Sequence, residues 1–336
     1  MMTTPSNARL QVPDILVAVD LTRCIEALEP LRRVGRVEYL ANPRQEQVEA
    51  MIGEFDAYMG HTDVRLTEQL LTRAPRLRVA CTCSTGTDHI DKDELSRRNI
   101  DLIALTTEYG LLDTFTSTAE MAWLLLLACR RRLPSLFERA KAGRIGLDPN
   151  YPLPPQLSSK TLGVIGYGRL GRMIVEYGKA FRMRILVCDP HKTINAPGVE
   201  QVNFDTLITT ADVVTLHVHL NDETHHMMSR DVFAKMKYGV TFINVSRGDL
   251  IDEDALVDAL RSGRVAAAGL DVVHNEWDPD LATRPLLQYA KTHDNLILTP
   301  HVAGGSLESV IDARIFIANQ LADYIARTGM THVAIE

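Results

Sequence analysis

The chain has 336 residues, a net charge of −7 and 46% hydrophobic residues, which is enough apolar material for two domains of ordinary size. No run of lysine and arginine is long enough to follow a phosphate backbone, so the composition argues against a nucleic-acid partner. The longest apolar stretch, at residues 121–129, is roughly half of what a bilayer requires, so we expect no membrane association.

Cysteine usage indicates the redox compartment. The five cysteines are sparse, odd in number and without a paired CxxC framework. Residues 1–13 are polar and show no signal-peptide pattern. We therefore expect a cytoplasmic protein.

Short β-branched runs recur at intervals that leave room for a helix between them, which is typical of βαβ units around a parallel sheet. Five strands are predicted in the first half of the chain, at residues 15–19, 36–40, 55–59, 77–81 and 101–105. Six more are predicted in the second half, at residues 161–165, 184–188, 213–217, 240–245, 266–272 and 296–299. The predicted fold class is α/β, with two doubly wound parallel-sheet domains.

Two further helices and a loop are predicted outside the two groups of strands. A long apolar helix is predicted over residues 116–133, and the Pro-rich stretch 148–156 is predicted to be a loop. A last helix is predicted over residues 307–326, after Gly304 and Gly305, which form a plausible hinge.

The strongest local motif follows the strand predicted at residues 161–165. Gly166-Tyr-Gly168-Arg-Leu-Gly171 is a GxGxxG turn, and apolar residues at helical spacing come directly after it. Gly166 permits the tight turn, Gly168 lets a pyrophosphate approach the backbone, and Gly171 lets the helix pack on the strand. The segment therefore predicts a dinucleotide site at a helix N-terminus.

Asp189 ends the next predicted strand, 18 residues after Gly171. A carboxylate there accepts hydrogen bonds from ribose hydroxyls and repels a 2′-phosphate, so it favours NAD over NADP. His191 and Lys192 follow closely and could weaken that preference, but a solvated loop is the interpretation we favour.

Three side chains of complementary chemistry follow predicted strands of the second series: Arg247, Glu276 and His301. Oxidising a 2-hydroxy acid needs a cation to hold the carboxylate and a base to take the hydroxyl proton as the hydride leaves. In open α/β sheets such groups gather at the carboxyl ends of strands. His217 and His219 mimic a metal-binding pair, but no third ligand of clear spacing accompanies them, so we predict no metal.

Four segments carry a resemblance to a known family. They read KTLGVIGYGRLG at residues 160–171, MKYGVTFINVSRG at 236–248, AGLDV at 268–272 and LTPHVA at 298–303. In this order they resemble the D-isomer-specific 2-hydroxyacid dehydrogenases, which include phosphoglycerate, D-lactate, glyoxylate and hydroxypyruvate enzymes. The resemblance implies a flavodoxin-like substrate domain from residues 1–125 and 305–336 and a Rossmann NAD-binding domain from residues 126–304.

The resemblance also implies residue roles. Arg247 would bind the substrate carboxylate and carbonyl oxygen, His301 would be the general acid/base, and Glu276 would raise the pKa of His301. Backbone N–H groups of Thr85 and Gly86, in the first domain, would hold the carboxylate. Contacts with the cofactor are implied for Gly166, Gly168, Arg169, Leu170, Gly171, Asp189, His217, Ser246 and Asp271, the last near the nicotinamide carboxamide.

The predicted function is an NAD-dependent oxidoreductase that moves a hydride between nicotinamide and a small D-2-hydroxy or 2-oxo acid. The alternative is an NAD(H)-sensing, corepressor-like scaffold with little turnover. The formate-oxidising branch is disfavoured, because it carries an amide where Glu276 stands. The resemblance implies a homodimer formed through the helix at residues 116–133, and burial of that helix in its own domain is the competing interpretation.

Overall fold

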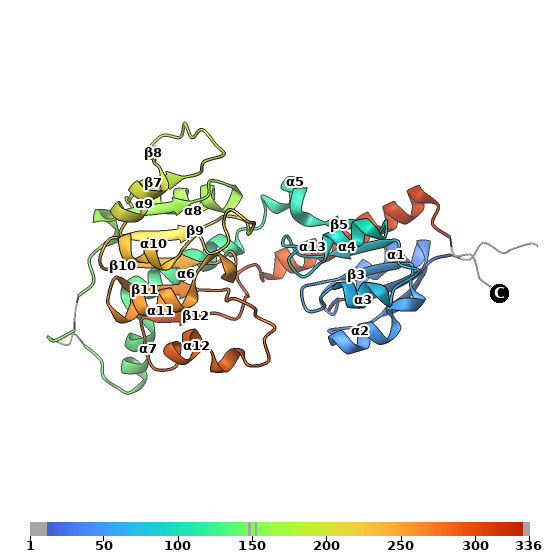
Figure 1. Cartoon of the computed structure of the whole chain (residues 1–336), viewed down its shortest axis with the longest axis horizontal. Helices are drawn as coiled ribbons and strands as arrows, with labels where there is room; N and C mark the ends of the chain where they lie inside the picture. Colours follow the sequence, from blue (N-terminus) through green and yellow to red (C-terminus); the bar gives the residue numbers. More distant parts are fainter. Residues whose placement is uncertain (1–11, 147–148, 152, 332–336) are drawn as a thin grey trace, which may run out of the picture. The chain divides into compact units, whose positions relative to one another are not determined.

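The computed structural model describes residues 12–146, 149–151 and 153–331 (Figure 1). The predicted loop at residues 148–156 is therefore described except at positions 148 and 152. The chain divides into two compact units: Met1–Phe115 with Leu307–Glu336, and Thr116–Ser306. Each unit is built around its own parallel sheet.

The sheet of the first unit has the order β2-β1-β3-β4-β5, with all neighbours parallel. Its strands are β1 (Asp14–Ala18), β2 (Arg36–Tyr39), β3 (Ala57–Gly60), β4 (Val79–Thr82) and β5 (Asp101–Ala104). This is the flavodoxin-like order, in which the chain starts in the middle and winds outward in both directions.

Helices cover both faces of this sheet, as alternate residues of β1 show. Ile15 and Val17 belong to a core under α1 and α13, whereas Leu16 and Ala18 belong to a core on the other face. The helices of the unit are α1 (Leu28–Val34), α2 (Gln45–Met51), α3 (Glu68–Thr72), α4 (Lys92–Arg97), α5 (Tyr109–Leu112) and α13 (Leu307–Thr328). Short 3-10 turns lie at η1 (Ile25–Ala27), η2 (Ile52–Glu54) and η3 (Leu105–Thr107).

The sheet of the second unit has the order β12-β11-β10-β9-β6-β7-β8, again all parallel. Its strands are β6 (Thr161–Ile165), β7 (Arg184–Cys188), β8 (Val199–Gln201), β9 (Val213–Leu216), β10 (Val240–Asn244), β11 (Val265–Leu270) and β12 (Leu296–Leu298). The winding direction reverses between β6 and β9. Ligands bind at such a switch point, beyond the carboxyl ends of the strands.

Two hydrophobic cores cover the faces of this second sheet. Helices α6 and α8 contribute to one core and α9, α11 and α12 to the other. The helices are α6 (Ser117–Arg131), α7 (Leu133–Lys141), α8 (Arg169–Ala180), α9 (Phe204–Thr210), α10 (Arg230–Lys235), α11 (Glu253–Arg261) and α12 (Pro285–Ala290). The 3-10 turns are η4 (Leu157–Ser159), η5 (Gly248–Leu250) and η6 (Leu281–Thr283). The predicted α/β class with two doubly wound sheets is confirmed.

Two elements differ from the sequence-based expectation. The second sheet has a seventh strand, β8, whose residues Glu200 and Gln201 are exposed at the sheet edge. The long helix predicted over residues 116–133 ends at Arg131, because Arg132 takes a left-handed conformation (φ 52°) and a separate helix, α7, begins at Leu133.

Helix α6 belongs to the second unit in its entirety. Seven of its fifteen residues are buried, and it packs on β10, β11 and α8. A Cβ on Gly269 of β11 would lie 2.9 Å from the Cβ of Leu125, so glycine permits this close approach. The first unit ends at residue 115 and the second begins at residue 116. The resemblance had implied a boundary after residue 125.

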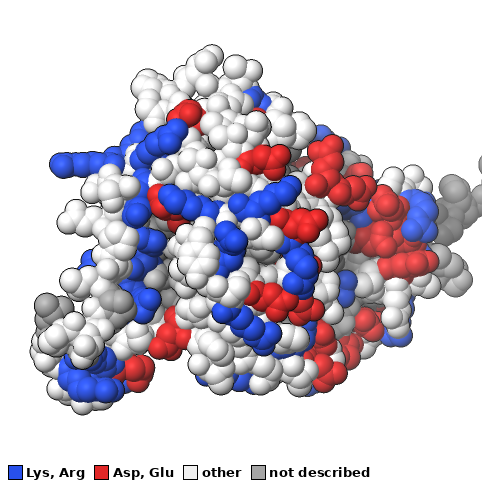
Figure 2. Space-filling view, turned by 60° about the vertical axis from the view of Figure 1, so that its left-hand side comes forward, with Lys and Arg blue, Asp and Glu red and all other residues white. Residues whose placement is uncertain are grey.

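The surface carries both signs of charge. Lysine and arginine side chains are interspersed with aspartate and glutamate on the face drawn in Figure 2. Among the described residues, no helix combines the length and the apolar character that crossing a bilayer requires. All five cysteines are buried free thiols.

Candidate active site

The glycine turn joins β6 to α8 at the switch point of the second sheet. Gly166 has φ +92°, and a Cβ there would lie 2.4 Å from the carbonyl oxygen of His217. A Cβ on Gly171 would lie 2.0 Å from the carbonyl oxygen of Gly166. Both positions therefore require glycine if the turn, β9 and α8 are to meet as they do.

Gly168 is different, because its missing side chain leaves open space. A Cβ there would meet no described atom within 4 Å, and Gly168 is the N-cap of α8 without a side-chain cap. Arg169 begins the helix, and Leu170 packs partly buried against the core. An uncapped helix N-terminus beside open space fits a pyrophosphate.

Asp189 lies next to this turn at the end of β7. Its Oδ2 accepts the N–H of Tyr167 (2.9 Å) and its Oδ1 accepts the N–H of His191 (3.0 Å). The Nζ of Lys192 donates to the carbonyl oxygen of Tyr167 (2.9 Å). Lys192 is exposed, as a solvated loop predicts, and it also contacts the glycine turn, as the alternative interpretation requires.

His217 follows β9 and contains a buried polar atom without a partner. Its Nε2 is 2.9 Å from the Oγ1 of Thr215, while its Nδ1 has no hydrogen-bond partner among the described residues. Burial lowers the pKa of His217 to about 4, so the ring is neutral at neutral pH. An unpartnered buried nitrogen beside the glycine turn fits a ligand that brings its own polar group.

Arg247 follows β10 on a loop that its neighbours hold in place. The buried Asn244 side chain donates to the carbonyl oxygen of Arg247 (2.7 Å) and accepts the N–H of Ser246 (3.0 Å). The Ser246 hydroxyl donates to the carbonyl oxygen of Leu216 (2.8 Å), which links the ends of β9 and β10. The Nη1 of Arg247 donates to the carbonyl oxygen of Ser246 (2.6 Å), which fixes one end of the guanidinium.

The Arg247 loop also contacts the loop that carries Glu276. A Cβ on Gly248 would lie 2.0 Å from the backbone carbon of Val273. The N–H of Val273 in turn donates to the Oε1 of Glu276 (3.3 Å). Glycine at position 248 thus lets the two loops touch.

His301 and Glu276 form the closest functional pair of the site. The Nδ1 of His301 lies 2.5 Å from the Oε2 of Glu276, and the two side chains are 44% and 23% exposed. This bond raises the pKa of His301 above its ordinary value, while partial burial and the positive charge of Arg247 oppose the increase. Glu276 and Arg247, the other two predicted catalytic residues, therefore both act on the imidazole of His301.

Asp271 organises the loop that carries His301. Its buried carboxylate accepts hydrogen bonds from the hydroxyl of Thr299 (2.5 Å) and the N–H groups of Val302 (3.1 Å) and Ala303 (2.8 Å). Its carbonyl oxygen accepts the N–H of His301 (2.9 Å), whose φ is +52°. The resemblance implies a cofactor contact for Asp271, but no sequence pattern predicted this positioning role or the roles of Asn244 and Gly248.

Thr85 and Gly86 lie in the first unit, on the loop after β4. Ser84 donates to the carbonyl oxygen of Gly86 (2.7 Å) and Thr106 to that of Thr85 (3.2 Å). Within the described part of the chain, the backbone N–H groups of Thr85 and Gly86 donate no hydrogen bond. They are therefore available to an anion. All the other predicted site residues lie in the second unit.

The fold and the site define a class: two-unit α/β proteins with a dinucleotide-type glycine turn and an arginine, glutamate and histidine at the carboxyl edge of the same sheet. The family model for the NAD-binding domain of D-isomer specific 2-hydroxyacid dehydrogenases matches residues 123–303. The chain belongs to the D-isomer specific 2-hydroxyacid dehydrogenase family. Membership of this family confirms the NAD-type cofactor expected from the glycine turn.

Several proteins are similar over most of this chain. The D-3-phosphoglycerate dehydrogenase of Archaeoglobus fulgidus is 31% identical over 92% of this chain, which spans 56% of that protein. The glyoxylate reductase of Aeropyrum pernix is 32% identical over 89% of both chains. A D-lactate dehydrogenase of Aquifex aeolicus, solved with NAD and lactic acid, is 27% identical with a TM-score of 0.81 over 96% of this chain and 100% of that one. This chain thus spans only about half the length of its phosphoglycerate dehydrogenase relatives.

Proposed function

We propose that this protein is an NAD-dependent oxidoreductase that interconverts a small D-2-hydroxy acid and the corresponding 2-oxo acid. The observation that carries the proposal is the His301–Glu276 pair, held at 2.5 Å with the charge of Arg247 acting on the same ring. Relatives named as glyoxylate, hydroxypyruvate and D-3-phosphoglycerate enzymes support the substrate class. When bound, the nicotinamide ring accepts or supplies the hydride.

The proton is handled by His301. In the direction of oxidation, the neutral imidazole takes the proton of the substrate hydroxyl, and in reduction the imidazolium returns it. Glu276 stabilises the imidazolium through the bond at Nδ1, so the other ring nitrogen, Nε2, is the one that exchanges a proton with substrate.

Arg247 is proposed to bind and polarise the substrate. Its planar guanidinium donates several parallel hydrogen bonds and matches a carboxylate and an adjacent carbonyl oxygen. The same positive charge opposes protonation of His301, so it favours return of the proton to the substrate during reduction. Backbone N–H groups of Thr85 and Gly86 are proposed to share the carboxylate.

The cofactor is proposed to be held by the turn Gly166–Gly171, with Asp189 at the ribose and His217, Ser246 and Asp271 toward the nicotinamide side. Open space at Gly168 and the unpartnered Nδ1 of His217 support this placement. The carboxylate of Asp189 favours NAD, although Lys192, which contacts this turn at Tyr167, supplies a positive charge nearby.

A homodimer in the cytoplasm is proposed as the working form. Helix α6 is largely buried in its own unit, which supports the competing interpretation for that helix. Helix α7 instead exposes Leu133 (46%) and Phe137 (59%), and an apolar surface of this kind supports a contact between two copies. Five buried free thiols support a reducing compartment.

The decisive experiment is multiple turnover with NADH and a panel of 2-oxo acids: glyoxylate, hydroxypyruvate, pyruvate and a phosphorylated analogue. We expect sustained NADH consumption with at least one acid. His301→Ala should lower kcat on the order of 10² to 10⁴ fold, the usual contribution of a general acid/base. His293→Ala serves as the control, because His293 precedes β12 and so lies at the amino end of the strand whose carboxyl end leads to His301.

The panel also separates the enzyme from a cofactor-sensing scaffold. NADH binding without turnover of any acid would favour the scaffold. Turnover that His301→Ala leaves unchanged would remove His301 from the mechanism.

A further inference from the structure

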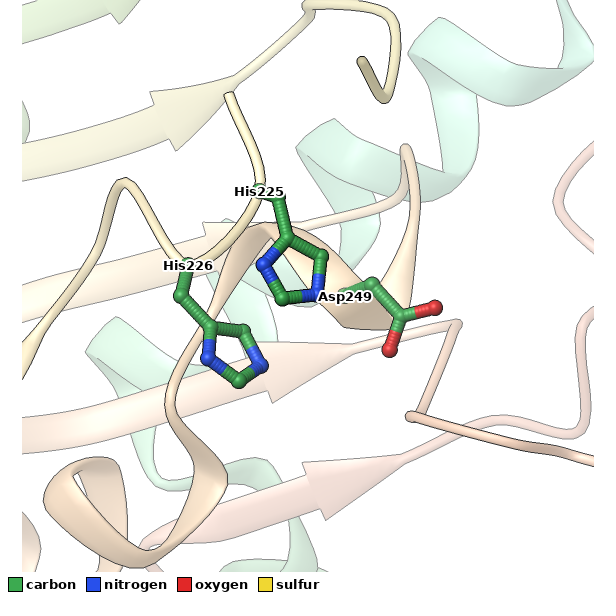
Figure 3. Close-up of side chains that lie close together, drawn as sticks. All are labelled: His225, His226 and Asp249. Atoms are coloured by element: carbon green, nitrogen blue, oxygen red, sulfur yellow. The ribbon is translucent and has the colours of Figure 1, made fainter. Parts of the chain in front are cut away.

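Three side chains outside the proposed catalytic trio gather at the surface of the second unit: His225, His226 and Asp249 (Figure 3). One ligand atom of each lies within 4.8 Å of those of the other two. The histidines are exposed on the loop between β9 and α10, and the half-buried aspartate lies in η5.

The backbone fixes the relative positions of these two segments. The N–H of His226 donates to the carbonyl oxygen of Asp249 (2.8 Å), and the N–H of Met228 donates to that of Leu250 (3.0 Å). Met228 and Ile251 also form a parallel bridge. The candidate ligands are therefore held together before any ion binds, which lowers the entropy cost of binding.

The donor set selects a class of ion. Two imidazole nitrogens and one carboxylate oxygen suit Zn²⁺ and similar divalent transition metals, with water in the remaining position. Mg²⁺ and Ca²⁺ prefer sites made of oxygen atoms alone. The imidazoles of His225 and His226 lie nearly parallel with centroids 4.1 Å apart, and Asp249 is also hydrogen-bonded to the ring of His274, which orients the carboxylate.

We propose that His225, His226 and Asp249 bind one divalent transition-metal ion of the Zn²⁺ class. The proposed ion does not take part in hydride transfer. Asp249 nevertheless lies two residues after Arg247, so a bound ion restrains the loop that carries the guanidinium. The histidine pair first considered in the sequence, His217 and His219, is not part of this cluster.

The test measures binding to tag-free, EDTA-treated protein without cofactor or substrate, so its outcome is independent of the proposed oxidoreductase activity. Isothermal titration with Zn²⁺ should give one ion per chain, and Mg²⁺ should give no heat of binding. Co²⁺ should produce the visible absorption of an ion with nitrogen and oxygen ligands. Zn²⁺ should also raise the midpoint of thermal unfolding.

Variants assign the ligands. The double variant His225→Gln/His226→Asn should weaken Zn²⁺ binding at least about 100-fold, because it removes two of three ligands. Asparagine is chosen at position 226 because His226 has φ +50°, a conformation that asparagine tolerates. Asp249→Asn tests the third ligand separately, and thermal unfolding of the metal-free variants verifies that they fold.

The matched control is His219→Gln, which removes an exposed histidine from the same loop and should leave Zn²⁺ affinity unchanged. No saturable binding to the wild-type chain would overturn the proposal. Equal affinity in the double variant, or an equal loss in His219→Gln, would show that the ion binds elsewhere.

Discussion

Hydrogen bonds to both the ring and the backbone of His301 hold its imidazole in position. Its Nδ1 bonds to Glu276, and its N–H bonds to the carbonyl oxygen of Asp271. The left-handed backbone at His301 is uncommon for a residue other than glycine, and such conformations persist where surrounding contacts impose them. Asp271 supplies those contacts by holding the following two N–H groups.

Glu276→Gln should change the pH dependence of turnover. Glu276 raises the pKa of His301, so removing its charge lowers that pKa. Reduction requires the imidazolium and should therefore decline at lower pH than in the wild type. Oxidation requires the neutral ring and should begin at lower pH. Profiles of kcat/KM against pH in both directions measure the shift.

Asp278→Asn is the control for this experiment, because it removes a carboxylate two residues away on the same loop. Its profile should match the wild type. A Glu276→Gln profile that also matches the wild type would contradict the role of Glu276.

Asp189→Ala should reduce the preference for NAD over NADP by about tenfold or more, because hydrogen bonds to a charged group contribute about 1.5 to 3 kcal/mol. Asp189→Asn removes the charge but keeps the size of the side chain, and its one acceptor oxygen retains the bond to the N–H of either Tyr167 or His191. The measurement is kcat/KM for both cofactors. Unchanged ratios in both variants would place cofactor specificity elsewhere.

Among the elements, the turn between β6 and α8 contains three glycines, and two of them, Gly168 and Gly171, have different physical roles. Gly171 is required by packing, since a Cβ would lie 2.0 Å from the carbonyl oxygen of Gly166. Gly168 has no such contact, and its φ of −77° is open to any residue. Packing among the described residues therefore does not require glycine at position 168, which supports the proposed contact with a pyrophosphate.

The matched pair Gly168→Ala and Gly171→Ala separates these roles. Gly171→Ala should lower the free energy of unfolding by about 1 to 3 kcal/mol, a cost typical of overpacking. Gly168→Ala should leave the free energy of unfolding unchanged and weaken NAD binding, because its methyl group occupies the space open to a pyrophosphate. Denaturant unfolding and NAD titration measure the two effects. A lower free energy of unfolding in Gly168→Ala, or an NAD affinity equal to that of the wild type, would contradict this assignment.

For the whole molecule, the exposed surface of α7 predicts the oligomeric state. Phe137→Glu should convert the proposed dimer to monomer, because a charge in an apolar interface loses its hydration. Light scattering coupled to size-exclusion chromatography measures the mass. Ile25→Glu, on an apolar residue of the first unit that is 50% exposed, is the control. A wild-type monomer, or a dimer that survives Phe137→Glu, would exclude α7 as the contact.

The sequence by itself determined the α/β class, eleven of the twelve strands to within about two residues at each end, and the glycine turn. These features depend on local patterns: β-branched runs, helical spacing and glycines at fixed offsets. Strand β8 escaped prediction because three mostly exposed residues at a sheet edge carry no such pattern. The break at Arg132 escaped because no glycine marks it and Leu133 keeps the helical spacing, four residues after Cys129.

Tertiary structure alone decided which side chains meet. His301 and Glu276 lie 25 residues apart in sequence, and the resemblance, not the residue pattern, paired them before the structure placed them 2.5 Å apart. The approach of Gly248 to Val273 and the three bonds of Asp271 depend on how adjacent strands bring their loops together. The grouping of His225 and His226 with Asp249 arises in the same way, because parallel strands bring distant segments to one edge of a sheet.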